Sequence, residues 1–130
     1  MRLEVYNGFL RICGEEDWKT LQAACNYATS LSDLERLEEA RALLRKTMPV
    51  ARRVFEESNE LTLKMRWIYA VTLCKDPDAT LADLREAVTT LEDTARTARR
   101  VLGSAHPSTA GIELSLRNAR AALRAREASA

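Results

Sequence analysis

Two stretches of this sequence repeat each other, and that repeat constrains the fold more than any other feature. Residues 37–55 (LEEARALLRKTMPVARRVF) align with residues 84–102 (LREAVTTLEDTARTARRVL) at an offset of 47 residues. Leu44 matches Leu91, and both copies end in the same A-R-R-V run. The matches fall mostly three and four positions apart, which is the spacing of one face of an α-helix. We therefore predict two copies of one helix, called helix B.

A second segment, called helix A, also repeats. Residues 20–31 align with residues 62–73 at an offset of 42 residues, and a third copy begins at Thr109. Residues 1–14 end in RICG, which aligns with the end of helix B. The predicted order is therefore a partial B helix followed by A, B, A, B and A. Repeats of this length are typical of solenoids, in which each helix pair buries its apolar stripe against its neighbours.

The repeats predict an all-α fold with one helical-repeat domain over residues 1–130. Its expected parts are the end of a preceding helix B (1–14), repeat one (15–57), repeat two (58–105) and a terminal capping helix (106–130). Only four Gly and three Pro residues are present, too few turn signals for a sandwich or a barrel.

Apolar stripes mark the faces that we expect to be buried. The stripe of helix A contains Leu21, Ala24, Tyr27, Ala28 and Leu31, and that of the first helix B contains Leu37, Ala40, Leu44, Met48, Ala51 and Phe55. Pro49 lies within this helix B, and an interior proline costs about 3 kcal/mol, so we predict a kink or a break near residues 45–49. Thr80 is the predicted N-cap of the second helix B.

Cysteine use and hydropathy bear on the location of the protein. Cys13, Cys25 and Cys74 are odd in number, widely spaced and without a C-x-x-C pair. We interpret them as small buried apolar side chains in an intracellular, reducing setting, and we expect a cytoplasmic protein. No apolar run approaches the ~18–20 residues of a membrane span, and the start does not read as a signal peptide.

Charge changes sign along the chain although the total is close to zero. Residues 1–40 carry a balance of −4 and residues 96–130 carry a balance of +5. Such a gradient suits either ordinary solvated helix faces or contacts with a partner of opposite charge.

Several short motifs resemble tetratricopeptide repeats, and more closely the kinesin-light-chain type. That type reads H-P-x-T, then L-N-N-L-A, then a Y-E-E-A start of helix B and a run that ends in V-L-G. Here residues 106–109 (HPST) keep the opening, and residues 25–28 (CNYA) stand in place of N-N-L-A. Residues 37–40 (LEEA) stand for the start of helix B, and residues 101–103 (VLG) for its end.

This resemblance implies antiparallel helix pairs stacked as a short right-handed α-solenoid, with the A helices lining a concave groove that binds a peptide or a helix. Asn26 matches an asparagine that often hydrogen-bonds a bound peptide in this type, whereas Ile68 and Ser115 replace it in the later copies. We therefore expect a more apolar groove centre. The predicted groove residues are Lys19, Gln22, Asn26, Thr29, Lys64, Ile68, Gly111 and Ser115.

No motif in the sequence predicts an enzyme, a cofactor or a metal site. His106 is the only histidine, and its position before Pro107 is typical of a helix start. Adjacent acidic pairs such as Glu38-Glu39 point in different directions on a helix, so they suit acid–base chemistry poorly. The sequence has no G-x-x-x-x-G-K motif.

The leading functional hypothesis is a non-enzymatic scaffold that binds a protein or peptide ligand. An alternative is a structural assembly unit that self-associates or docks through its end helices and complementary charge. Nucleic-acid binding by the stripe Arg117, Arg120 and Arg124 is a weaker alternative, because acidic residues lie on the same segment. Trp18 and Trp67 are each either core residues or part of a groove wall.

Overall fold

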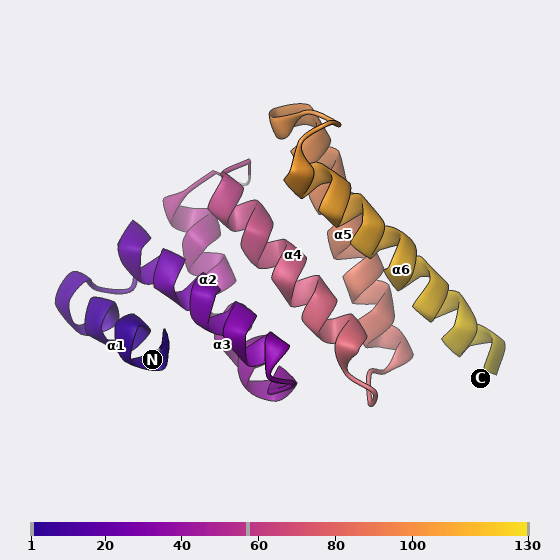
Figure 1. The fold of residues 1–130 in the computed structure, drawn as a ribbon, viewed down its shortest axis with the longest axis horizontal. Coiled ribbons are helices and arrows are strands. Elements are labelled where there is room, and N and C mark those ends of the chain that lie inside the picture. Colours follow the sequence, from indigo (N-terminus) through magenta and orange to yellow (C-terminus); the bar gives the residue numbers. More distant parts are fainter. Residues whose placement is uncertain (1, 57, 130) are drawn as a thin grey trace. The chain divides into compact units, whose positions relative to one another are not determined.

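The computed structural model describes residues 2–56 and 58–129, which form six α-helices and no strand (Figure 1). The helices are α1 (Arg2–Cys13), α2 (Trp18–Asp33), α3 (Leu37–Val54), α4 (Glu60–Lys75), α5 (Leu81–Leu102) and α6 (Pro107–Ser129). The all-α prediction is confirmed. The helices also occur where the alternation of B and A copies predicts them, with α1, α3 and α5 at the B positions.

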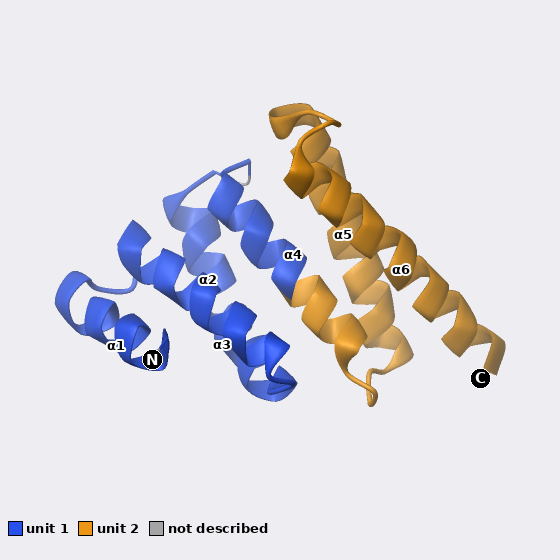
Figure 2. Cartoon of the chain, viewed as in Figure 1, with its two compact units in different colours: residues 1–68 blue, residues 69–130 orange. Residues whose placement is uncertain are grey.

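The chain divides into two compact units, residues 1–68 and residues 69–130 (Figure 2). Within the first unit, α2 packs against both α1 and α3. Within the second unit, α5 packs against α6. The boundary between the units falls inside α4, and the division into repeats at residues 57 and 105 remains a prediction from the sequence.

The predicted apolar stripes form most of the core. Leu21, Ala24, Ala28 and Leu31 of α2 and Ala40, Leu44 and Ala51 of α3 are at most 2% exposed. Tyr27, Leu37, Met48 and Phe55 are only partly buried, since they lie at the edges of these stripes. The expectation that all three cysteines are buried is wrong for Cys13, which is exposed at the end of α1.

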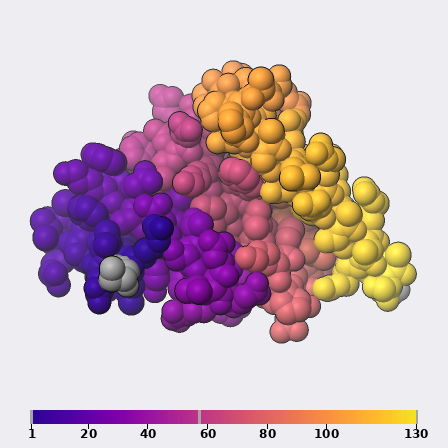
Figure 3. Space-filling model, in the orientation of Figure 1, coloured from indigo at the N-terminus to yellow at the C-terminus, as the bar shows by residue number. Residues whose placement is uncertain are grey.

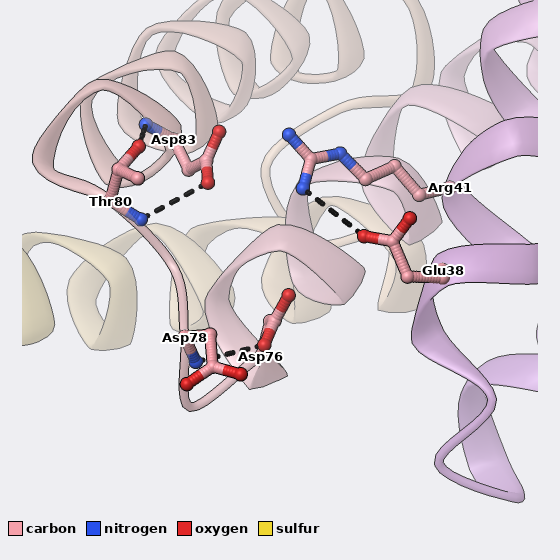
Figure 4. A network of polar contacts seen from close by, with 6 residues as sticks. All are labelled: Glu38, Arg41, Asp76, Asp78, Thr80 and Asp83. Carbon is pink, nitrogen blue, oxygen red and sulfur yellow. Dashed lines mark hydrogen bonds and ion pairs between the residues drawn. The ribbon is translucent and has the colours of Figure 1, made fainter.

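The start of α5 carries a reciprocal cap (Figure 4). The backbone N–H of Asp83 donates to Thr80 Oγ1, and the backbone N–H of Thr80 donates to Asp83 Oδ2, each at 3.1 Å. Such a capping box satisfies two backbone donors that a helix start would otherwise leave without partners. At the other end Gly103 has φ 92°, a conformation that favours glycine. The predicted N-cap at Thr80 is confirmed.

The start of α3 lacks such a cap, and its proline does not interrupt it. Arg36 occupies the N-cap position without a side-chain hydrogen bond to the backbone. The prediction was a kink or a break near residues 45–49, and the break is wrong, because the helix runs unbroken from Leu37 to Val54. Pro49 is exposed, whereas its neighbours Val50 and Ala51 are buried. The proline ring therefore lies on the outer side of the helix, and the residues that follow it stay in the core.

Among the helices that the structure describes, none combines the length and the apolarity needed to cross a bilayer.

Candidate functional site

A surface hollow of about 290 Å3 lies between α1 and α2 in the first unit. Helix α1 contributes two apolar side chains to it, and α2 contributes both apolar and polar ones. We call this the N-terminal hollow, and its lining residues are Val5, Phe9, Trp18, Lys19, Gln22, Ala23 and Asn26. Three of the eight groove residues predicted from the sequence, Lys19, Gln22 and Asn26, therefore come together here.

Stacking between two tyrosines holds α1 against α2. The ring centroids of Tyr6 and Tyr27 are 6.3 Å apart with an interplanar angle of 28°. Tyr6 is 7% exposed, and burial raises its pKa, with the charge of Glu15 adding to the shift. Stacked aromatic pairs contribute about 0.5–1.5 kcal/mol beyond the area that they bury. This contact places Val5 and Phe9 beside the first two turns of α2.

The rim of the hollow is set by the start of α2. Asp17 caps the helix, because its Oδ1 accepts a hydrogen bond of 2.8 Å from the backbone N–H of Lys19. The helix therefore begins at Trp18, whose side chain is left 57% exposed. Lys19 Nζ lies 6.0 Å from the centroid of the Trp18 ring, within the range of a cation–π interaction.

The hollow combines apolar walls with uncommitted polar groups. Gln22 and Asn26 are partly exposed, and within the part of the chain described their amide groups have no hydrogen-bond partner. Amide groups can both donate to and accept from a peptide backbone. Trp18 is exposed beside these groups, and tryptophan is one of the residue types enriched at protein-binding hot spots.

The other predicted groove residues of the first unit lie outside this lining. The hydroxyl of Thr29 donates to the Cys25 carbonyl at 2.9 Å, so this donor is already used within α2. Lys64 is exposed on α4 and Ile68 is partly buried. Burial raises the pKa of the Cys25 thiol to about 11, and the nearby charge of Lys64 partly offsets the shift. That thiol is therefore neutral and unreactive at physiological pH.

The second unit has two adjoining hollows of about 340 and 260 Å3. They share Cys74, Lys75 and Ala122, so they form one surface feature over α4, α5 and α6. Ser115 lines the smaller hollow, as a groove residue should, whereas Gly111 lies one turn earlier on α6 and outside both linings. Burial raises the pKa of the Cys74 thiol, which keeps it protonated at neutral pH.

The arginine stripe on α6 is partly engaged in ion pairs within the unit. Arg120 Nη2 lies 2.9 Å from Glu92 Oε2 of α5, and Arg99 of α5 pairs with Glu113. Arg117 and Arg124 are exposed. Within the stripe, the charge of Arg120 is therefore partly neutralised by Glu92.

His106 and the acidic residues show structural roles. His106 Nδ1 accepts a hydrogen bond of 3.0 Å from the backbone N–H of Ser108, so the side chain helps to start α6, as predicted. Glu39 pairs with Arg36 one turn away. Among the residues that the structure describes, no three His, Cys, Asp or Glu side chains gather into a metal-binding group.

Four residues that line the N-terminal hollow are not among the groove residues predicted from the sequence. Val5 and Phe9 are spaced four residues apart, and the alignment of residues 1–14 with helix B indicates a helix there. That spacing could have placed both on one face. Trp18 stays undecided between core and groove in the sequence, and the structure places it on the rim of the hollow. Ala23 carries no signal of its own.

Comparison with known families gives one match. A family model described as Tetratricopeptide repeat matches residues 20–59 and residues 79–108, which together make up more than half of the chain. Searches of curated proteins and of solved structures gave no match.

Proposed function

We propose that this chain, which belongs to the tetratricopeptide repeat family, is a non-enzymatic scaffold that binds a segment of another protein. Tetratricopeptide repeats mediate protein–protein interactions. The observation that carries the proposal is the N-terminal hollow, in which three of the predicted groove residues, all from α2, lie beside the exposed ring of Trp18.

The chemistry of the hollow suggests how a segment would be held. An apolar side chain of the partner would occupy the space beside Val5, Phe9 and Trp18. Burial of one such side chain contributes about 1.5–3 kcal/mol. The amides of Gln22 and Asn26 would hydrogen-bond the backbone of the segment, and these bonds would fix its direction more than its affinity.

The remaining predicted residues extend this proposal. Lys64 would add a positive charge and Ile68 an apolar contact from α4, in the same unit as the hollow. Thr29 would contribute its methyl group, since its hydroxyl is occupied. Gly111 and Ser115 belong to the second unit, where Ser115 would bind a ligand through the hollow that it lines.

Capture of proteins from a cell extract tests the proposal. We expect Trp18→Ala, and separately the pair Asn26→Ala with Ile68→Asp, to abolish partner capture while helicity measured by circular dichroism stays unchanged. The matched control is Leu34→Ala, which removes a side chain that is 66% exposed outside the hollow. Undiminished capture by Trp18→Ala and by the pair Asn26→Ala with Ile68→Asp would contradict the assignment.

A further inference from the structure

Helix α1 has an outer face that the N-terminal hollow does not use. Gly8, Arg11 and Ile12 follow Glu4 by four, seven and eight positions. This spacing puts all four residues on one side of the helix. This side lies opposite Tyr6, the buried residue of α1. We call these four residues the α1 outer face. Figure 3 shows the atoms of α1, in indigo, at the molecular surface.

The α1 outer face is unusually apolar at one end. Ile12 is 79% exposed, the largest value among the exposed large apolar residues of the described chain. Isolated exposed apolar residues are common in proteins. Here, however, the largely exposed Ile12 lies beside two residues of opposite charge on the same face of the helix.

Those two charges make the face complementary to itself. Glu4 and Arg11 are seven residues apart, about 10.5 Å along the helix axis. Neither makes an ion pair with another residue in the described part of the chain. If two copies of α1 lie antiparallel across a two-fold axis, Glu4 of each copy faces Arg11 of the other. One symmetric contact then forms two ion pairs.

We propose that the α1 outer face is an interface between two copies of this chain, related by a two-fold axis near Gly8. Gly8 lies at the centre, where the helix backbones approach most closely. A Cβ built on Gly8 has nothing within 4 Å, so the structure of one copy does not require glycine there. Because glycine weakens a helix interior, its presence fits a close approach by a second backbone.

The charge on α6 argues against a two-fold contact between two copies of this chain through that helix. Arg117 and Arg124 are exposed on α6, and a two-fold contact through this surface would bring arginines of both copies together. Like charges placed opposite each other destabilise a contact. A helix of 12 residues offers a small interface, so the α1 dimer should be weak and reversible.

A charge exchange tests the interface with the full chain. Sedimentation velocity over a concentration series at low ionic strength should show a reversible monomer–dimer equilibrium. Glu4→Arg and Arg11→Glu should each weaken the dimer at least tenfold, since each places like charges across the axis. An equimolar mixture of the two variants should regain association as a one-to-one dimer, and so should the double variant Glu4→Arg with Arg11→Glu.

Controls separate this interface from a folding defect and from the N-terminal hollow. Gly8→Ala favours the helix but adds a methyl group at the crossing point, so it should weaken the dimer while circular dichroism shows no loss of helix. Trp18→Ala should leave the dimer unchanged. A wild-type chain that stays monomeric would overturn the proposal, and so would charge variants that dimerise as the wild type does. The wild-type chain could also form species larger than a dimer that the double variant Arg117→Glu with Arg124→Glu does not form. That result would overturn the two-fold interface in favour of a head-to-tail contact.

Discussion

The two compact units differ in the lengths of their helices and in how those helices are joined. In the second unit, α5 and α6 contain 22 and 23 residues and are joined by Arg85–Glu127, Glu92–Arg120 and Arg99–Glu113 ion pairs. In the first unit, α1 has 12 residues and leaves Val5, Ile12 and Trp18 near it more than half exposed. These three ion pairs link the two long helices of the second unit. The first unit leaves apolar side chains exposed around α1, and we place both binding surfaces there.

The two B helices show the same contrast in their backbone. Helix α5 has a capping box at its start and no proline. Helix α3 has no side-chain cap and carries Pro49 in its interior. Both nevertheless bury the equivalent leucine, Leu44 in α3 and Leu91 in α5, each 0% exposed. The two copies therefore differ in their helix starts and in the proline, whereas both bury the equivalent leucine.

Removal of the equivalent core leucines should have the largest effect. Leu44→Ala and Leu91→Ala should each lower the free energy of unfolding by about 3 kcal/mol, through lost burial and the cavity left behind. Denaturant titrations would measure both, and hydrogen exchange would show whether each change weakens only its own unit. Leu114→Ala, on a side chain that is 51% exposed, is the control and should cost less than about 0.5 kcal/mol. A large difference between Leu44 and Leu91 would show that the two units are not packed alike.

Replacement of Pro49 should reduce the difference between the B helices. Arg96 occupies the equivalent position in α5, so Pro49→Arg gives α3 the residue of its other copy. The change restores a backbone donor inside the helix, and we expect stability to rise by about 1–2 kcal/mol. Thermal unfolding would detect the gain. An unchanged or lower midpoint would mean that the proline does not weaken α3.

Loss of the cap on α5 should have a smaller effect. Thr80→Ala removes the acceptor for the Asp83 N–H and should cost about 1 kcal/mol. Arg36→Ala, at the same position of α3, should change stability by less than about 0.5 kcal/mol, because that side chain makes no capping bond. Denaturant titration of both variants compares the helix starts directly. Equal losses would show that the capping box contributes nothing specific.

The sequence predicts the helices well because their signals are local. Thr80 marks a helix start through its side-chain hydroxyl, and Gly103 marks a helix end through its backbone conformation. The repeat offsets predict where each helix lies. The break expected at Pro49 does not occur, and an estimate from the proline alone leaves out the burial of Val50 and Ala51. Tertiary packing often outweighs local preference.

The site is only partly predictable because it depends on one contact between helices. Asn26 and its neighbours on α2 follow from the resemblance to a known repeat. The wall formed by Val5 and Phe9 does not, because the stacking of Tyr6 on Tyr27 brings α1 to that position. No repeat pattern within either helix encodes this pairing.

The emission of Trp18 tests the central claim most directly. In a Trp67→Phe background Trp18 is the only tryptophan, and its ring is 57% exposed. A peptide selected from a random display library against the wild-type chain is then titrated into this variant. The proposal predicts a saturable blue shift of the emission as the peptide covers the ring, and a Kd at least tenfold weaker after Asn26→Ala with Ile68→Asp. Tight binding without any change in Trp18 emission would contradict the claim that the N-terminal hollow is the binding site.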